Sequence, residues 1–259
     1  MSDFLKIKSL LDDWYQKTNH IRFIENDPIS IPHKFRKLPD IEIAGFFAAI
    51  MAWGNRKTIV LKCTDLLNRM DNAPHDFVSH AKKSELERLK GFVHRTLNET
   101  DVLYLVDFFC RWYAENDSLE KAFSRFITPT DTSVEKGLIG FRNLVFNTEY
   151  VPKRTQKHIS SPVTNSATKR INMYLRWMVR KDRSGVDFGL WNDINPNQLV
   201  CPLDVHVHRV ASHLDLLTRP QSDWKAAIEL TNNLKKFDAD DPIKYDFALF
   251  GLGLAGFAK

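Results

Sequence analysis

The chain has few of the features that would indicate a secreted or membrane-spanning protein. It has 259 residues, of which three are cysteines, Cys63, Cys110 and Cys201. Because these cysteines are far apart in the sequence and their number is odd, they form neither a disulfide framework nor a metal ribbon. No apolar run approaches the roughly 18 residues that a membrane span needs. The N-terminal stretch MSDFLKIKSLLDDWY is acidic and amphipathic, unlike a secretory signal. We therefore expect no membrane contact and a cytoplasmic location.

Glycine and proline are also scarce, at 10 and 11 residues, and alternating apolar and polar runs are rare. Apolar residues recur instead at i, i+3 and i+4, the spacing of one face of an α-helix, so the pattern predicts an all-α chain. A hydrophobic content of 43% and a charged content of 27% are ordinary for a globular protein and exclude disorder as the main state. The predicted helices span residues 3–17, 40–53, 56–70, 84–90, 99–115, 118–126, 133–146, 166–181, 204–217, 222–234 and 242–257.

Positive charge is concentrated in one stretch of the chain. The formal net charge is +5, but residues 151–185 contain nine basic residues and one acid, a formal charge of +8. Such a concentration favours a polyanionic partner, most simply nucleic acid. A solvated basic helix is the alternative, and charge alone does not separate the two. The basic residues are Lys153, Arg154, Lys157, Lys169, Arg170, Arg176, Arg180, Lys181 and Arg183.

The segment SSPVTNSATKRINMYLRWMVRKD contains the first candidate catalytic residue. As a helix, it places Lys169, Arg176 and Arg180 on one face. Lys169 lies in the first turn, where the positive end of the helix dipole disfavours a charged ammonium, and neighbouring Arg170 acts in the same direction. A neutral amine is a nucleophile, so Lys169 is a candidate for covalent catalysis. The alternative is an ordinary exposed lysine on a basic face.

A second segment, CPLDVHVHRVASHLDLLTRP, supplies a candidate carboxylate. Apolar residues follow Asp204 at helical spacing, which predicts that Asp204 caps a helix. Asp204, His206 and His208 also spell Asp-x-His-x-His, which on a strand would place three metal ligands on one face. On a helix, side chains two positions apart point about 200° apart. We therefore expect neither a metal ion nor a cofactor here.

Together the two segments resemble the helix-hairpin-helix DNA glycosylase superfamily. In that family a catalytic lysine opens the helix after a hairpin, and a later VDxHVxRVxxRLGL-like stretch brings an essential aspartate to the same cleft. The stretch LDVHVHRVASHLDLL matches, with Asp204 at the aspartate and Lys169 at the lysine. Their separation of 35 residues is similar to that of the archaeal 8-oxoguanine glycosylase branch. The segment TKRINMYLRWMVRKD also resembles an uncharacterised bacterial family known only as a domain of unknown function.

Two further stretches carry the resemblance, and two features depart from it. The stretch IEIAGFFAAIMAWGNRKTIV is similar to an early helix pair whose turn supplies a residue that fills the gap left by an extruded base. Asn55 stands at that place, and the alternative is that Asn55 only forms the turn Trp53–Gly54–Asn55. The stretch DPIKYDFALFGLGLAG looks like the closing helix under the site. The family's Gly-x-Gly hairpin is replaced by HISSPVTNSAT, and the four-cysteine iron–sulfur loop is missing, so no cluster is expected.

The resemblance implies a base-excision DNA glycosylase with AP-lyase activity, which removes an oxidised purine from double-stranded DNA. Asp204 would stabilise positive charge on the sugar, and Lys169 would displace the base and form a Schiff base that permits β-elimination. Basic side chains and a wedge would offset the cost of extruding the nucleotide. The expected DNA contacts are Asn55, Arg56, Arg170, Arg176 and Arg180.

The resemblance also implies two helical lobes with a cleft between them, in a monomer. Residues 1–39 would add an N-terminal helix to the C-terminal lobe, residues 40–199 would form a central lobe with the variant hairpin and helix, and residues 200–259 would form the C-terminal lobe. Two alternatives stay open. One is a non-catalytic nucleic-acid-binding protein on the same scaffold, and the other is a helical protein of unknown function with protein partners.

Overall fold

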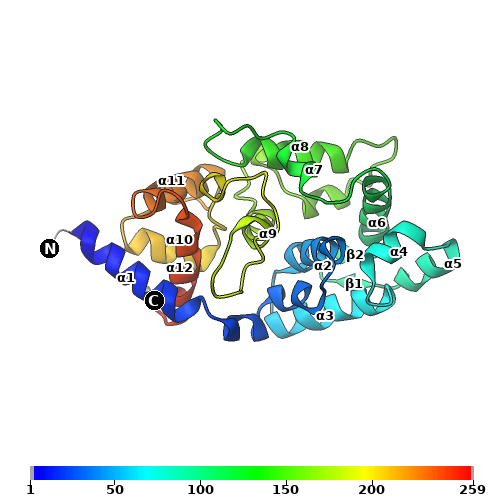
Figure 1. Cartoon of the computed structure of the whole chain (residues 1–259), viewed down its shortest axis with the longest axis horizontal. Coiled ribbons are helices and arrows are strands. Elements are labelled where there is room, and N and C mark those ends of the chain that lie inside the picture. The colour runs from blue at the N-terminus through cyan, green and yellow to red at the C-terminus, as the bar shows by residue number, and fades with distance from the viewer. Residues whose placement is uncertain (1–2, 258–259) are drawn as a thin grey trace. The chain divides into compact units, whose positions relative to one another are not determined.

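The computed structural model describes residues 3–257, which are mostly helical (Figure 1). This confirms the predicted all-α class, apart from one antiparallel hairpin of strands β1 (Val93–His94) and β2 (Leu97–Asn98). The α-helices are α1 (Asp3–Thr18), α2 (Leu38–Met51), α3 (Arg56–Arg69), α4 (Pro74–His80), α5 (Lys83–Leu86), α6 (Glu99–Tyr113), α7 (Lys121–Ser124), α8 (Glu135–Val145), α9 (Lys169–Val179), α10 (Val205–His213), α11 (Trp224–Lys235) and α12 (Tyr245–Leu254). Short 3-10 helices span Ile21–Asn26, Pro28–Ser30, Pro32–Lys34, Glu87–Leu89, Thr155–His158, Pro162–Thr164, Pro196–Gln198 and Pro242–Lys244.

Hydrophobic periodicity located most of these helices, with differences of a few residues at their ends. The helix predicted from residue 166 begins at Lys169, because Thr168 before it has a left-handed backbone with φ of 46°. The helix predicted to residue 217 ends at His213, and Asp215 beyond it has φ of 55°. The short helix α4 and the β1–β2 hairpin were not predicted. No helix within residues 3–257 is both long enough and apolar enough to cross a bilayer.

The described chain forms two compact units. Unit 1 contains the residues up to Phe23, the segment Ile127–Lys136 and the residues from Ser161 onwards. Unit 2 contains Ile24–Phe126 and Gly137–Ser160. The predicted boundaries at residues 39 and 199 differ from this division in three segments. Residues 24–39 belong to unit 2, and residues 127–136 and 161–199 belong to unit 1. Both candidate catalytic residues belong to unit 1.

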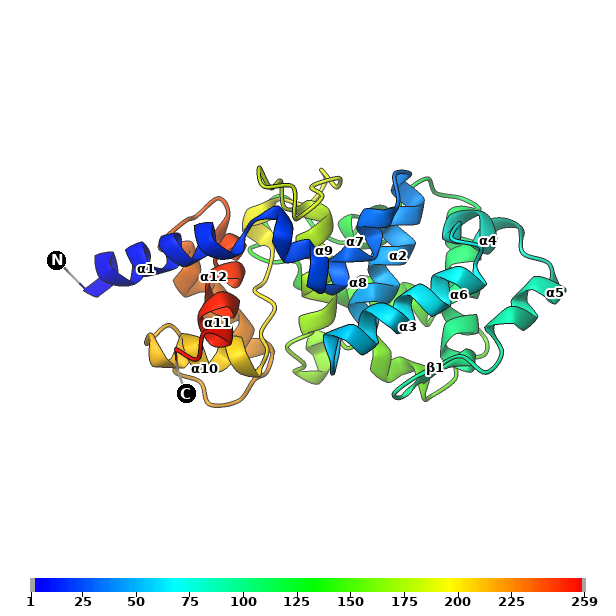
Figure 2. The same cartoon turned by 90° about the horizontal axis from the view of Figure 1, so that it is seen from below.

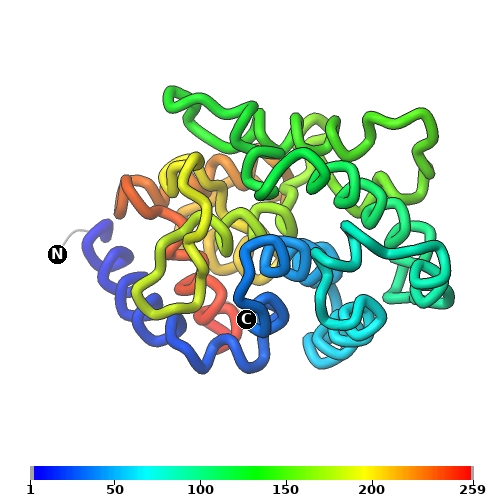
Figure 3. The backbone as a smooth tube through the Cα atoms, turned by 45° about the vertical axis from the view of Figure 1, so that its right-hand side comes forward, coloured from blue at the N-terminus to red at the C-terminus, as the bar shows by residue number. Residues whose placement is uncertain are grey.

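Helix α12 is the centre of unit 1. Its residues are hydrophobic almost all round and mostly buried, as expected for a helix covered on several sides. It packs against α1 on one side and α10 on another, so the first and last helices lie together (Figures 2 and 3). Gly251 allows the close approach of α1, because a Cβ atom there would overlap the side chain of Thr18. Gly253 faces His206 of α10.

Unit 2 is built around a cluster of phenylalanines from α2, α6, α7 and α8. The ring of Phe46 meets those of Phe109 and Phe141 edge to face, with centroids 5.4 and 5.7 Å apart. The ring of Phe123 stacks on Phe141 at 4.0 Å. Such geometries are those that aromatic pairs prefer. The cluster fixes α2, whose end leads into the turn that carries Asn55.

The close contact at Gly251 leads to a stability prediction. Gly251→Leu should lower the free energy of unfolding by about 2–3 kcal/mol, because the added side chain must displace α1 from α12. Leu254→Ala on the same helix should cost much less, since that leucine is exposed. Urea unfolding followed by circular dichroism measures both. Equal losses in the two variants would contradict the proposed α1–α12 packing.

Candidate active site

Lys169 and Asp204 meet in unit 1. Lys169 is the first residue of α9, and Asp204 is the N-cap of α10. The Nζ atom of Lys169 lies 2.9 Å from Oδ2 of Asp204. The two side chains are 35% and 19% exposed, so the pair is partly covered by the protein but reachable from solvent. The structure thus brings together the two residues that the sequence singles out for catalysis.

The two oxygens of Asp204 have different partners. Oδ1 accepts a hydrogen bond from the backbone N–H of Val207 at 2.8 Å, and Oδ2 faces Lys169. Burial raises the pKa of Asp204, but Lys169, the Val207 N–H and His206 together lower it by more, so the pKa lies below its ordinary value. Asp204 is therefore an ionised carboxylate at neutral pH, held in one orientation by the cap.

The segment before α9, residues 158–168, contains two residues with unusual backbone conformations. Asn165 and Thr168 have left-handed backbones, with φ of 56° and 46°, the conformation that glycine usually supplies. For a β-branched residue this conformation is strained and needs support from its surroundings. Nδ2 of Asn172 gives that support by donating to the Ala167 carbonyl and to Oγ1 of Thr168, each at 3.1 Å. These contacts fix the residue that immediately precedes Lys169.

A chain of polar contacts ties this segment to α10. Nδ2 of Asn165 donates to Oδ2 of Asp223 at 2.9 Å, and Nε of Arg219 donates to Oδ1 of the same carboxylate at 2.7 Å. The bonds to Arg219 hold the pKa of Asp223 well below its ordinary value. Nε2 of His208, on α10, lies 3.0 Å from the Arg219 carbonyl oxygen and donates to it. The segments that carry Lys169 and Asp204 are therefore joined by a second route besides the ion pair.

Arg176 lies in the interior of unit 1, with 4% of its surface exposed. Its Nε donates to Oδ1 of Asp187 at 3.3 Å, and its Nη1 pairs with Asp246. A buried guanidinium is stable only when carboxylates compensate it. This corrects the prediction that Arg176 binds nucleic acid from an exposed face of the helix.

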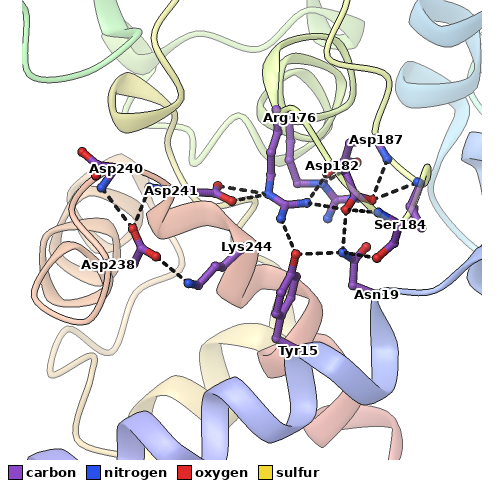
Figure 4. Close-up of polar contacts among 12 residues, drawn as sticks. Tyr15, Asn19, Arg176, Asp182, Ser184, Asp187, Asp238, Asp240, Asp241 and Lys244 are labelled. Carbon is purple, nitrogen blue, oxygen red and sulfur yellow. Dashed lines mark hydrogen bonds and ion pairs between the residues drawn. The ribbon is translucent and has the colours of Figure 1, made fainter.

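Arg180 is equally enclosed, with 2% of its surface exposed. It donates to Oδ2 of Asp187 at 3.0 Å, to Oδ2 of Asp241 at 2.9 Å and to the hydroxyl of Tyr15 at 2.7 Å. Figure 4 shows Tyr15, Asp187 and Asp241 converging on this network. The predicted DNA contact of Arg180 is corrected for the same reason. The two arginines hold α1, α9 and the 180–187 loop together.

Asp246, on α12, extends the network towards the catalytic pair. Burial raises the pKa of Asp246 to about 6; Arg176 and Lys169 lower it, whereas the negative charge of Asp204 raises it. Asp246 is thus a second carboxylate within electrostatic reach of Lys169 and Asp204. From the sequence, this helix was expected only to pack under the site. An acid inside the apolar stretch YDFALFGLGL was the signal that could have found it.

The other predicted DNA-contact residues lie in different places. Arg170 is half-buried in unit 1, and burial lowers its pKa. Asn55 and Arg56 are in unit 2, where Asn55 caps α3 by accepting the Thr58 N–H at 3.2 Å. Asn55 thus has a turn-forming role as the N-cap of α3. The basic stretch 151–185 is itself divided between the two units.

The Asp-x-His-x-His sequence lies on a helix, as the spacing of apolar residues predicted. Asp204 caps α10, Nδ1 of His206 lies 3.3 Å from Arg209, and His208 is bonded to the Arg219 carbonyl. The three side chains therefore have separate partners. Across residues 3–257, no group of three histidine, cysteine, aspartate or glutamate side chains is arranged to hold a metal ion.

Comparison with known proteins finds one match. A family model described as a protein of unknown function (DUF2400) matches residues 27–255 and so spans most of both units. Neither a curated protein nor a solved structure matches the chain.

The raised pKa of Asp246 predicts a pH-dependent stability. In the folded chain Asp246 has a pKa of about 6, whereas in the unfolded chain its pKa is near the ordinary 3.8. The protonated carboxyl group therefore stabilises the folded chain below pH 3.8, and this contribution is lost as the pH rises through about 6. The free energy of unfolding of the wild type should therefore fall relative to that of Asp246→Asn over this range, by on the order of 3 kcal/mol.

Urea unfolding at several pH values measures this difference. Asp13→Asn, which changes an exposed carboxylate on α1 of the same unit, is the control and should follow the wild type closely. If the curves for the wild type and Asp246→Asn run parallel, Asp246 does not have the altered ionisation described.

Proposed function

The chain belongs to the DUF2400 family, and from that premise we propose that it is a base-excision DNA glycosylase with AP-lyase activity on an oxidised purine in double-stranded DNA. The observation that carries the proposal is the contact of 2.9 Å between Lys169 and Asp204. Cleavage of an N-glycosidic bond through a Schiff base needs an amine and a carboxylate that can reach the same sugar. Each is fixed at the start of a helix and partly open to solvent.

The first step breaks the bond between the sugar C1′ and the base. The base leaves with the electron pair of that bond and takes up a proton from water, while positive charge develops on the sugar. The ionised carboxylate of Asp204 stabilises this charge. Once the base has departed, Oδ2 of Asp204 accepts a proton from the Lys169 ammonium, which frees the nitrogen lone pair to form a bond to C1′.

The second step is strand cleavage. The nitrogen then gives up a proton, and the bond between C1′ and the ring oxygen breaks. The ring oxygen takes the electron pair of that bond and a proton from water, and an iminium forms between Lys169 and C1′. Loss of a proton from C2′ then expels the 3′-phosphate, whose oxygen takes the electron pair of the broken bond. Water adds to the iminium and releases Lys169 as a free amine. Every step uses only the residues described and water.

The proposal also carries what the resemblance implies beyond the site. It places the chain near the archaeal 8-oxoguanine branch of the helix-hairpin-helix glycosylases, as a monomer in the cytoplasm. It includes an architecture of two helical lobes with a cleft for DNA. Asn55, Arg56 and Arg170 are the DNA contacts that it retains, since Arg176 and Arg180 are buried. The function needs no metal or cofactor.

Borohydride trapping tests this function directly. The wild type, mixed with a duplex containing 8-oxoguanine and sodium borohydride, should give a covalent protein–DNA adduct, because borohydride reduces the iminium to a stable amine. Lys169→Met should give none. Asp204→Asn should lower the rate of adduct formation by about 10²- to 10⁴-fold. The amide oxygen of asparagine can still cap α10, so this loss reports on charge and not on unfolding.

Lys181→Met is the matched control, because Lys181 is an exposed lysine just beyond the other end of α9. It should trap DNA as well as the wild type. An adduct that persists in Lys169→Met would contradict the role of Lys169. Absence of any adduct with oxidised or abasic duplexes would remove the enzymatic proposal.

A further inference from the structure

Two turns of unit 2 lie against each other at the end of α2. One turn, Trp53–Asn55, connects α2 to α3, and the other carries Arg95 between β1 and β2. Nε2 of His94, in β1, is 3.0 Å from the carbonyl oxygen of Met51, the last residue of α2. This buried hydrogen bond fixes the hairpin against the helix end. The residues at the tips of both turns are therefore held together by the fold.

The Arg95 side chain lies over the ring of Trp53 in this first turn. Its Cζ atom is 4.3 Å from the centroid of the Trp53 ring. The side chain also passes close to Gly54, where an added Cβ atom would lie 2.5 Å from Nη1 of Arg95. Gly54 has φ of 108°, so glycine is required there by the backbone as well as by the arginine. Stacking on an indole orients a guanidinium and leaves its edge for other partners.

The guanidinium of Arg95 keeps its donors unused among residues 3–257. No carbonyl or carboxylate oxygen of these residues is hydrogen-bonded to it, and the side chain is exposed. Arg125 provides a useful contrast, because it also stacks on a tryptophan of unit 2, Trp112, at 4.8 Å. Its Nε, however, donates to the Lys121 carbonyl at 2.9 Å. Arg95 is thus a pre-oriented cation with unused hydrogen-bonding capacity.

The surroundings of Arg95 are positively charged. Arg56 and Lys57 occupy the first turn of α3, which contains no acidic residue. Cations at the positive end of a helix dipole are unfavourable unless an anion offsets them. Burial lowers the pKa of His94, and the charges of Arg95 and Lys62 lower it further. Nearby charge therefore favours an anionic ligand at these turns.

We propose that Arg95, oriented by Trp53, binds a backbone phosphate of duplex DNA beside the α2–α3 turn. The planar fork of a guanidinium matches the oxygens of a phosphate, and a repeating polyanion suits several cations around one turn better than an isolated anion does. The choice of DNA as the ligand rests on the proposed function, but the contact itself does not need Lys169 or Asp204. Arg95 is outside the set of DNA contacts that the sequence suggested.

Equilibrium binding of a fluorescent, undamaged duplex by fluorescence anisotropy tests this contact with the full chain. Arg95→Gln should weaken binding several-fold, and it should reduce the slope of log affinity against log salt by about one. Trp53→Leu should weaken binding as well, by releasing Arg95. The double variant should be no weaker than Arg95→Gln alone, because the tryptophan acts through the arginine.

Arg125→Gln is the matched control, since it removes the same charge from an exposed, tryptophan-stacked arginine of the same unit. It should leave the affinity and the salt slope as in the wild type. Circular dichroism and thermal melting establish that each variant is folded. If Arg95→Gln and Arg125→Gln have equal effects, only net charge matters and the proposal is wrong.

The two proposals fail separately in these measurements. Binding that depends on Arg95, without borohydride trapping, overturns the glycosylase and leaves the DNA contact standing. Trapping by Lys169, together with binding that is indifferent to Arg95, overturns the contact alone. Two further results also overturn the Arg95–DNA contact. One is that the chain binds phosphatidylserine vesicles through Arg95 but does not bind the duplex, and the other is that the chain binds no duplex at all.

Discussion

The candidate site depends on the two contacts that a single carboxylate, Asp204, makes with its two oxygens. Asp204 closes the first turn of α10 with one oxygen and meets the Lys169 ammonium with the other. The cap fixes the carboxylate, and the carboxylate fixes the lysine, so the position of a flexible side chain is set by a rigid helix end. Asp223 adds a second link, through Asn165 and Arg219, and keeps the two segments in register.

Charged side chains next to this pair are also buried in the interior of unit 1. Arg176 and Arg180 share Asp187, and each has a further carboxylate, Asp246 or Asp241. Ion pairs at this depth stabilise little in themselves, but removal of one partner leaves an uncompensated charge. The network therefore commits α1, α9 and α12 to one arrangement around the site. Burial raises the pKa of Asp246 in spite of Arg176, within electrostatic reach of Lys169 and Asp204, whose charges matter for the proposed reaction.

The sequence was informative where local chemistry decides the outcome. Helical periodicity located α9 and α10, and the capping pattern placed Asp204 at a helix start. It failed where partners are far apart in the chain. A helical pattern treats an arginine as solvent-facing, whereas Arg176 and Arg180 face acids that lie at positions 187, 241 and 246. Arg95 was missed for a related reason, because its stacking on Trp53 joins a hairpin to a turn some forty residues earlier.

The central claim is that the Lys169 amine becomes covalently bonded to a nucleotide sugar. Mass spectrometry of peptides from the borohydride-reduced protein–DNA complex tests it most directly, since the modified residue is read from the fragment masses. The account predicts a single modified site, Lys169. A sugar remnant on another lysine or on the N-terminal amine, with Lys169 unmodified, would contradict it.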